Sequence, residues 1–326
     1  MTKKVALLVG GWNAERDVSI NKGKHVEAAL IEAGYDLKVV EVTKDIPKLI
    51  SKLKEFNPDA VFNNLHGRIG EDGVMQSLMT LLEIPYTHSG VMASAIAMDK
   101  PMAKKLAQNE GVPVAKGALA TLDEVRDESV VPRPYVVKPF NEGSSVDIHI
   151  IKENDNHLER VIESWNYGAL AMVEEYIPGK ELTVAVLDRK AQAVTDIISH
   201  TGGFFDYEAK YEDDRTELVL PAKIPEDVYE AALDYAERVY NVIGCHGLAR
   251  CDFRYDETKG IKGLCFLEIN TQPGLTAESI GPSQCVYNGM SFVQLCSHLV
   301  ETAQCHGLIK DQSDPLSKES VHRLSA

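Results

Sequence analysis

Short apolar runs alternate with amphipathic segments over residues 1–90. The apolar runs KVALLVGG, DLKVVEV and DAVFNNLHG lie at 4–11, 36–42 and 59–67, and helical spacing is seen in INKGKHVEAALIEAG and IPKLISKLKEF between them. Strands that alternate with helices in this way predict a doubly wound parallel sheet. Ligands of such a sheet bind at the carboxyl ends of its strands, where the polar clusters GGWNAERDVS and NLHGRIGEDG follow the first and third runs.

The pattern changes after this region. THSGVMASAIAMDKPMAKKLAQNEG, at 87–111, predicts one helix with lysines on an otherwise small, apolar face, and longer strands begin near Leu182. We predict an N-terminal α/β domain at 1–90, two further domains at 91–181 and 182–310, and a disordered polar tail at 311–326.

Two apolar strands near the C-terminus form a predicted antiparallel hairpin. GLARCDFRY and GLCFLEIN are joined by the turn-like DETKGIKG, and in the first strand alternation places Arg250 and Asp252 on one face. If the pairing is symmetric about Gly260, Asp252 lies opposite Glu268 and Arg250 lies opposite Asn270.

Two carboxylates facing each other across a strand pair need a positive partner, because their β-carbons would lie only about 5 Å apart. Asp252, Glu268 and Asn270 offer oxygen ligands alone, which favours Mg²⁺ or Mn²⁺ over zinc. Acidic residues on a strand are more commonly just solvated. The apolar neighbours of Glu268 favour the metal site over that alternative.

A candidate phosphate site follows the strand YVVK. Lys138 ends this strand, and the loop PFNEGSSV after it could fold backbone N–H groups over phosphates. The alternative is that Lys138 is simply a solvated residue at the end of a strand and binds no phosphate. Neither GxxxxGK[ST] nor GxGxxG occurs, which argues against a Walker-type ATPase and a nicotinamide dehydrogenase.

Composition and charge limit which partners and which cellular compartment we expect for the chain. The chain of 326 residues has a net charge of -15, which argues against nucleic acid. No apolar run approaches the roughly 18 residues that a membrane span needs, and MTKKVALLVGG predicts a strand rather than a signal peptide. The six cysteines, all from Cys245 onward, contain no CxxC pair and indicate neither a disulfide framework nor a zinc site. We therefore expect a cytoplasmic protein.

Seven segments in order carry a resemblance that covers the chain to about Ile309: GGWNAERDVS, LHGRIGEDG, SGVMASAIAMDK, KPFNEGSSV, FDYEAKY, GLARCDF and LEINTQPGLT. Together they resemble the ATP-grasp superfamily and, within it, the D-alanine–D-alanine ligase family. The resemblance implies an N-terminal domain packed on two α+β domains that clamp ATP. It also implies a reaction in which ATP phosphorylates one D-alanine and the amine of a second attacks the acyl phosphate, in the synthesis of peptidoglycan precursors.

The same resemblance implies the nucleotide and metal residues. Two Mg²⁺ or Mn²⁺ ions would be held by Asp252, Glu268 and Asn270, and the phosphates by Lys100, Lys138, Ser144 and Lys210. The adenosine would contact Glu174, Glu175, Ile177 beside Tyr176, and Glu181. For Glu181 a plain exposed strand position is the alternative.

The substrate residues come from the resemblance as well. Glu15 would receive the ammonium of the first D-alanine, with Ser144 and Tyr211 as its hydrogen-bonded companions. Arg250 and the N–H of Gly274 would stabilise the oxyanion, and Ser279 would bind the carboxylate of the second D-alanine. His66 and Glu71 would lie beside the substrates, although a lone histidine is more often a core residue.

The chain differs from the family pattern in three places, and two other classes of protein are alternatives to the ligase. The chain departs from the family pattern at Trp12-Asn13, Phe140-Asn141 and Gln272, while an intact EAKY favours a dipeptide over a D-alanyl-D-lactate product. A carboxylate–amine ligase with another acceptor would lose Glu15, Tyr211 and Ser279. A catalytically silent scaffold would lose Arg250, Glu268 or Asn270. The family is commonly dimeric, so we expect a homodimer.

Overall fold

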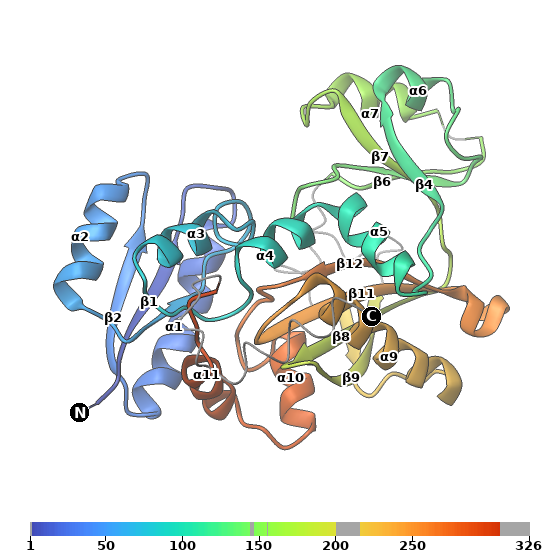
Figure 1. Ribbon diagram of the computed structural model, residues 1–326. Coiled ribbons are helices and arrows are strands. Elements are labelled where there is room, and N and C mark those ends of the chain that lie inside the picture. The colour runs from blue at the N-terminus through green and yellow to red at the C-terminus, as the bar shows by residue number, and fades with distance from the viewer. Residues whose placement is uncertain (1, 144–146, 155, 200–215, 307–326) are drawn as a thin grey trace, which may run out of the picture.

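The computed structural model describes residues 2–143, 147–154, 156–199 and 216–306, and Figure 1 shows three sheets with helices between and around them. The first sheet has the strand order β2-β1-β3, and both pairings are parallel. Its elements are β1 (Lys4–Gly10), α1 (Arg16–Glu32), β2 (Asp36–Val42), α2 (Ile46–Phe56), β3 (Ala60–Asn63) and α3 (Val74–Leu81). The expected doubly wound α/β start of the chain is confirmed.

The single helix expected at 87–111 is wrong, because two helices occupy that segment. They are α4 (Val91–Met98) and α5 (Lys100–Asn109), and the chain between them is extended at Asp99. The Asp99 side chain accepts a hydrogen bond from the Met102 N–H at 3.0 Å, and Pro101 stands in the first turn of α5, where its missing N–H is not needed. This break starts α5 at Lys100, so that its N-terminal turn lies at the site.

An antiparallel sheet of four strands follows, in the order β4-β7-β5-β6, and lies at the upper right of Figure 1. Two short helices cover one side of it, and their apolar side chains form a separate core with the sheet. The elements are β4 (Gly117–Thr121), α6 (Leu122–Arg126), β5 (Tyr135–Lys138), β6 (His149–Ile151), α7 (Leu158–Ser164) and β7 (Leu170–Glu175).

A second antiparallel sheet has five strands in the order β10-β9-β8-β11-β12. Helix α9 packs on it, and α4 and α5 add small residues such as Ala97 and Ala103 to the same core. The elements are β8 (Lys180–Leu187), β9 (Lys190–Ser199), β10 (Thr216–Val219), α9 (Glu226–Ile243), β11 (Leu248–Tyr255), the 3₁₀ turn η1 (Glu257–Gly263) and β12 (Leu264–Asn270). Two antiparallel sheets after a parallel one match the expected fold class.

The last two helices join the five-stranded sheet to the first sheet. Helices α10 (Ile280–Tyr287) and α11 (Phe292–Glu301) share an apolar core with β1 and α1. Gln284 of α10 is fully buried and fastens the helix to the sheet. It accepts the Ala185 N–H at 2.7 Å and donates to the Thr183 carbonyl at 3.0 Å and to Thr195 Oγ1 at 2.8 Å. The division at 90 and 181 stays a prediction, and the predicted tail at 311–326 lies outside the described residues.

Two expectations from composition can be compared with the structure. All six cysteines are free, and five of them are buried. Among the described residues, no helix combines the length and the apolar character that crossing a membrane requires.

Candidate active site

Two pockets adjoin at Glu268, which lines both. The larger, of about 340 Å³, is lined by nine of the predicted site residues: Glu15, His66, Glu71, Lys100, Arg250, Glu268, Asn270, Gly274 and Ser279. The smaller lies between the two antiparallel sheets and is lined by Lys138, Glu174, Glu175, Ile177, Glu181, Asp252 and Glu268. The structure thus brings these residues together from six parts of the chain, at 15, 66–71, 100, 138, 174–181 and 250–279. The predicted residues Ser144, Lys210 and Tyr211 lie outside the described residues.

The β11–β12 pair has the register expected from the sequence. Asp252 lies opposite Glu268 and Arg250 lies opposite Asn270, and a β-bulge follows directly after Asp252. A positive group neutralises each carboxylate. The Arg250 guanidinium donates to both oxygens of Asp252 at 2.8 and 2.7 Å, and Lys100 Nζ lies 3.2 Å from Glu268 Oε2. A bulge beside a functional pair is a common way to aim side chains into a site.

The donor set at this pair fits a hard cation. Asp252, Glu268 and Asn270 offer carboxylate and amide oxygens, the ligands that Mg²⁺ and Mn²⁺ prefer. Across the described ranges no three His, Cys, Asp or Glu side chains form a metal-binding group. A cation here therefore needs the amide of Asn270 and oxygens of a bound ligand. Asn270 Oδ1 also accepts the Gln272 N–H at 2.8 Å, which fixes the orientation of the amide.

Glu15 is held where the β1–α1 loop meets the loop after β3. Asn13 Nδ2 donates to the carbonyls of His66 and Arg68 at 2.7 and 2.9 Å, and Asn13 Oδ1 accepts the Glu15 N–H at 3.0 Å. Gly67 has a φ of +67°, and a β-carbon there would collide with Oε2 of Glu15. The departure from the family pattern at Asn13 therefore has a structural role, because it binds the two loops together.

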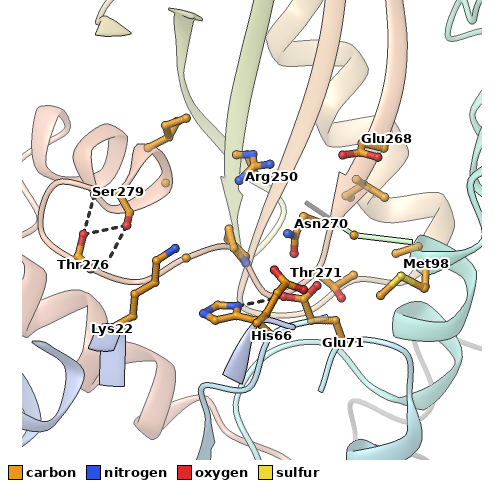
Figure 2. Close-up of a pocket in the computed structure, with 18 of the residues that line it drawn as sticks. Lys22, His66, Glu71, Met98, Arg250, Glu268, Asn270, Thr271, Thr276 and Ser279 are labelled. Atoms are coloured by element: carbon orange, nitrogen blue, oxygen red, sulfur yellow. Dashed lines mark hydrogen bonds and ion pairs between the residues drawn. The ribbon is translucent and has the colours of Figure 1, made fainter. Parts of the chain in front are cut away.

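Burial keeps His66 and Glu71 neutral. Their side chains meet at 3.1 Å between Nδ1 and Oε1. Burial lowers the pKa of His66 to about 4, helped by the charge of Lys22 and opposed by Glu15. Burial raises the pKa of Glu71 to about 8, against the Gly67 N–H and the charge of Arg250, which favour the ionised form. At neutral pH the pair is imidazole and carboxylic acid, on the wall of the pocket opposite Arg250 and Glu268 (Figure 2).

Ser279, the residue just before α10, lines another wall of the larger pocket. Its Oγ is 2.8 Å from Thr276 Oγ1 and accepts the Thr276 N–H at 3.1 Å. Gly274 lies nearby, and a β-carbon on it would collide with Nζ of Lys22. Figure 2 shows the Lys22 side chain rising from α1 toward Thr276 and Ser279.

Sequence reasoning missed Lys22. It follows Glu15, the residue just before α1, by seven residues, or about two helical turns, which places the two side chains toward the same side of the helix. That spacing was the available signal, but only the folded chain shows that the lysine faces Gly274.

The smaller pocket has a buried charge cluster on its wall. Glu174 of β7 contacts Nζ of Lys138 with Oε2 at 2.6 Å and Nζ of Lys104 with Oε1. Burial alone would raise the pKa of Glu174, but the two ammonium groups outweigh burial and hold the pKa at about 2. At the pocket's far end Glu181 lies 3.6 Å from the Arg254 guanidinium. Lys104 is a second residue that sequence reasoning missed.

Gln272, another departure from the family pattern, connects separate parts of the chain. It is buried, and its Nε2 donates to the carbonyl of Leu65, in the loop after β3. The loop after β12 is thereby attached to the N-terminal sheet. The substitution places a hydrogen bond between the two walls of the larger pocket.

Comparison with known proteins agrees with this geometry. A family model described as the D-ala D-ala ligase C-terminus matches residues 106–301. The chain is 49% identical to the D-alanine–D-alanine ligase of Granulibacter bethesdensis, over 93% of this chain and 98% of that protein. It is 46% identical to that of Acidiphilium cryptum, over 93% and 99%.

Solved structures give the same result. The ligase of Bacillus anthracis complexed with ATP superposes with a TM-score of 0.75 at 26% identity, over 92% of this chain and 97% of that one. The VanG D-Ala:D-Ser ligase of Enterococcus faecalis gives 0.77 at 26% identity, over 93% and 99%.

Two antiparallel sheets that enclose a lysine- and carboxylate-lined slot, next to an N-terminal parallel sheet, define an ATP-grasp ligase. Within that class the chain belongs to the D-alanine–D-alanine ligase family.

The neutral state of Glu71 predicts how stability depends on pH. An unfolded glutamate loses its proton near its ordinary value of 4.5, whereas Glu71 keeps it to about 8 when folded. The folded state binds more protons between these values, so this residue makes the unfolding free energy fall as pH rises, by up to about 1.4 kcal/mol per pH unit. Glu71→Gln should remove that part of the decline.

The measurement is urea unfolding at pH 7.5, 7.75 and 8, where His66, whose ordinary pKa is 6.5, is mostly neutral in the unfolded state and neutral in the folded state. Glu55→Gln, on the exposed side of α2, is the control and should keep the parent's slope. Parallel slopes for the parent and Glu71→Gln would show that Glu71 is ionised throughout.

Proposed function

We propose that the protein joins two D-alanine molecules into D-alanyl-D-alanine, with ATP converted to ADP and phosphate, for the synthesis of peptidoglycan precursors. The observation that carries the proposal is the larger pocket, where Glu15, Arg250 and Ser279 come from separate segments and face one space next to Lys100. A donor, an acceptor and a γ-phosphate all fit the charges on its walls.

The first half-reaction uses the donor end of the pocket. Glu15 binds the ammonium of the first D-alanine, whose carboxylate oxygen attacks the γ-phosphorus of ATP. The bond from that phosphorus to the β,γ-bridging oxygen breaks, and D-alanyl phosphate and ADP form. Lys100 and Lys138 hold the phosphates, and Asp252, Glu268 and Asn270 would hold the divalent cations. When bound, two Mg²⁺ or Mn²⁺ ions would neutralise phosphate charge during the transfer.

The second half-reaction uses the acceptor end. The neutral amine of the second D-alanine attacks the acyl carbon and forms the C–N bond, and the nitrogen loses a proton to phosphate or solvent. The bond from the acyl carbon to the phosphate oxygen breaks as the tetrahedral intermediate collapses. Arg250 and the Gly274 N–H donate to the oxyanion. Ser279, at the N-terminus of α10, and Lys22 bind the carboxylate of the second D-alanine, where an anion is favoured by both the helix end and the ammonium.

Four further roles are proposed from the family resemblance alone. Ser144 and Tyr211 accompany Glu15 at the first substrate, and Lys210 approaches the transferring phosphate. Glu174, Glu175 and Ile177 line the adenine site, and Glu181 accepts the ribose hydroxyls.

A different acceptor is the alternative function. The VanG ligase, named for D-serine, has a TM-score as high as that of the D-alanine enzyme, so the fold does not distinguish acceptors. A D-alanine relative at 49% identity favours D-alanine for this chain.

Phosphate release from Mg-ATP tests the function directly. Reactions contain D-alanine, L-alanine, D-alanine with D-serine or D-lactate, or no amino acid, and products are identified by mass. We expect release with D-alanine and a D-alanyl-D-alanine product. Glu268→Gln should lower the rate at least about 100-fold, and Glu257→Gln, on the exposed η1 turn, should keep it. A mixed dipeptide as the main product would move the assignment to the alternative acceptor.

Lys22 gives a sharper test of the acceptor site. Lys22→Met removes a charged partner of the carboxylate and should raise the KM for the second D-alanine about tenfold or more. The KM for ATP should stay within about twofold, and Lys22→Arg should recover most of the affinity. Exposed Lys24→Met, on the same helix, is the control. An unchanged acceptor KM in Lys22→Met would remove this residue from the site.

We also propose a cytoplasmic homodimer. Val74 and Leu81 of α3 lie two turns apart and are 55% and 81% exposed, and Met92 of the neighbouring α4 is 70% exposed. Exposed apolar patches commonly mark protein–protein contacts, and a second copy of the chain that packs here would remove these side chains from water. Sedimentation should give twice the chain mass of 35.9 kDa for the parent and for Ile31→Glu, and one chain for Leu81→Glu. A parent that stays monomeric at all concentrations would contradict this.

A further inference from the structure

Three buried charges of the smaller pocket form a cluster with one negative and two positive members. Lys104, Lys138 and Glu174 are only 4%, 6% and 3% exposed. Lys138 contacts Oε2 of Glu174 at 2.6 Å, and Lys104 contacts Oε1. Each lysine thus takes its own oxygen of one carboxylate, and the cluster carries one net positive charge.

The three members differ in what they face. Lys138 and Glu174 line the slot between the sheets. Lys104 lines neither that slot nor the larger pocket and reaches Glu174 from α5, which packs on β12. Lys138 lies diagonally across the β5–β7 pair from Glu174, whereas Val136 lies directly opposite Glu174. This register brings the Lys138 side chain into the slot. Lys104 therefore does not reach a nucleotide in the slot except through Glu174.

A buried carboxylate with a single lysine would hold that lysine tightly. Separating them would leave an uncompensated charge in a region of low dielectric, which is strongly unfavourable. With two lysines on one carboxylate, one can leave and a neutral pair remains behind.

We propose that Lys104 is a positioning residue that neutralises Glu174 and so frees Lys138 to bind the phosphates of ATP. The inference rests on the proposed function, in which ATP is the substrate and Lys138 one of its phosphate ligands. Without ATP Lys138 lies on Glu174. With ATP it moves its ammonium to the phosphates, while Lys104 alone keeps the carboxylate paired. The extra positive charge of the cluster matches the anionic phosphate chain.

The primary test is ATP binding by calorimetry with Mg-ATP alone, together with the KM values for ATP and D-alanine. Lys104→Met should weaken ATP binding about tenfold or more, because Lys138 would be trapped on Glu174. The KM for D-alanine should stay within about twofold, and Lys104→Arg should recover most of the affinity for ATP. Lys105→Met, the exposed neighbour on α5, is the matched control. If Lys104→Met does not fold, Lys104→Gln, which keeps a hydrogen-bond donor without the charge, takes its place.

A double-mutant cycle separates this role from a structural one. Glu174→Gln removes the charge that would trap Lys138, so Lys104→Met should change ATP binding less than about threefold in that background. A structural ion pair that only attaches α5 to β7 would lower stability without this reversal. An equal loss of ATP affinity in both backgrounds, or normal ATP binding by a folded Lys104→Met, would overturn the proposal.

The pH profile gives a second readout. Burial lowers the pKa of Lys104 to about 8, opposed by the charge of Glu174 on β7, with Lys138 on β5 and Cys265 on β12 also facing it. The KM for ATP should rise above pH 8 in the parent and stay flat in Lys104→Arg, because a guanidinium keeps its charge. Equal profiles would count against the proposal. A parent that neither binds ATP nor releases phosphate would instead contradict the proposed function, which keeps the two failures distinct.

Discussion

The pairing of Asp252 with Glu268 across β11 and β12 is the constraint on which the rest of the site depends. Two unit charges about 5 Å apart repel by about 3 kcal/mol at an effective dielectric constant near 20. The fold therefore has to bring positive charge to this pair. Arg250 comes from two residues away on the same strand face, and Lys100 comes from a helix that starts only because the chain breaks at Asp99. Both side chains then line the larger pocket.

The parts predicted from sequence are those that local periodicity determines. The parallel start of the chain follows from alternation within short segments, and the register of Asp252 with Glu268 follows once the hairpin is taken as symmetric about Gly260; the structure confirms both. The break at Asp99 was missed because an apolar helical pattern continues across it. An aspartate two residues before a proline was the local signal for a new helix.

Lys22 and Lys104 could not be found in the same way. Each matters because of a contact between segments that are distant in the sequence. Lys22 lies against the loop of Gly274, and Lys104 contacts Glu174 of β7. A lysine on a helix is by default a solvated residue. The local signals, the spacing of Lys22 from Glu15 and the small, apolar face around Lys104, do not say which distant segment the ammonium meets. The departures at Asn13 and Gln272 are similar, since their hydrogen bonds join loops that the sequence separates by tens to hundreds of residues.

Helix α5 contacts both antiparallel sheets through two of its lysines. Lys100 and Lys104 lie one turn apart on it and contact carboxylates on different sheets, Glu268 on β12 and Glu174 on β7. The smaller pocket lies between those sheets, and both carboxylates line it. A change in the distance between the sheets must therefore stretch or exchange a lysine contact of α5. Because a buried ion pair resists separation, the exchange is easiest where an incoming phosphate replaces the carboxylate as partner. If ATP binds in the slot as proposed above, its phosphates can take that place, and the contacts that hold the slot together without nucleotide then let it adjust.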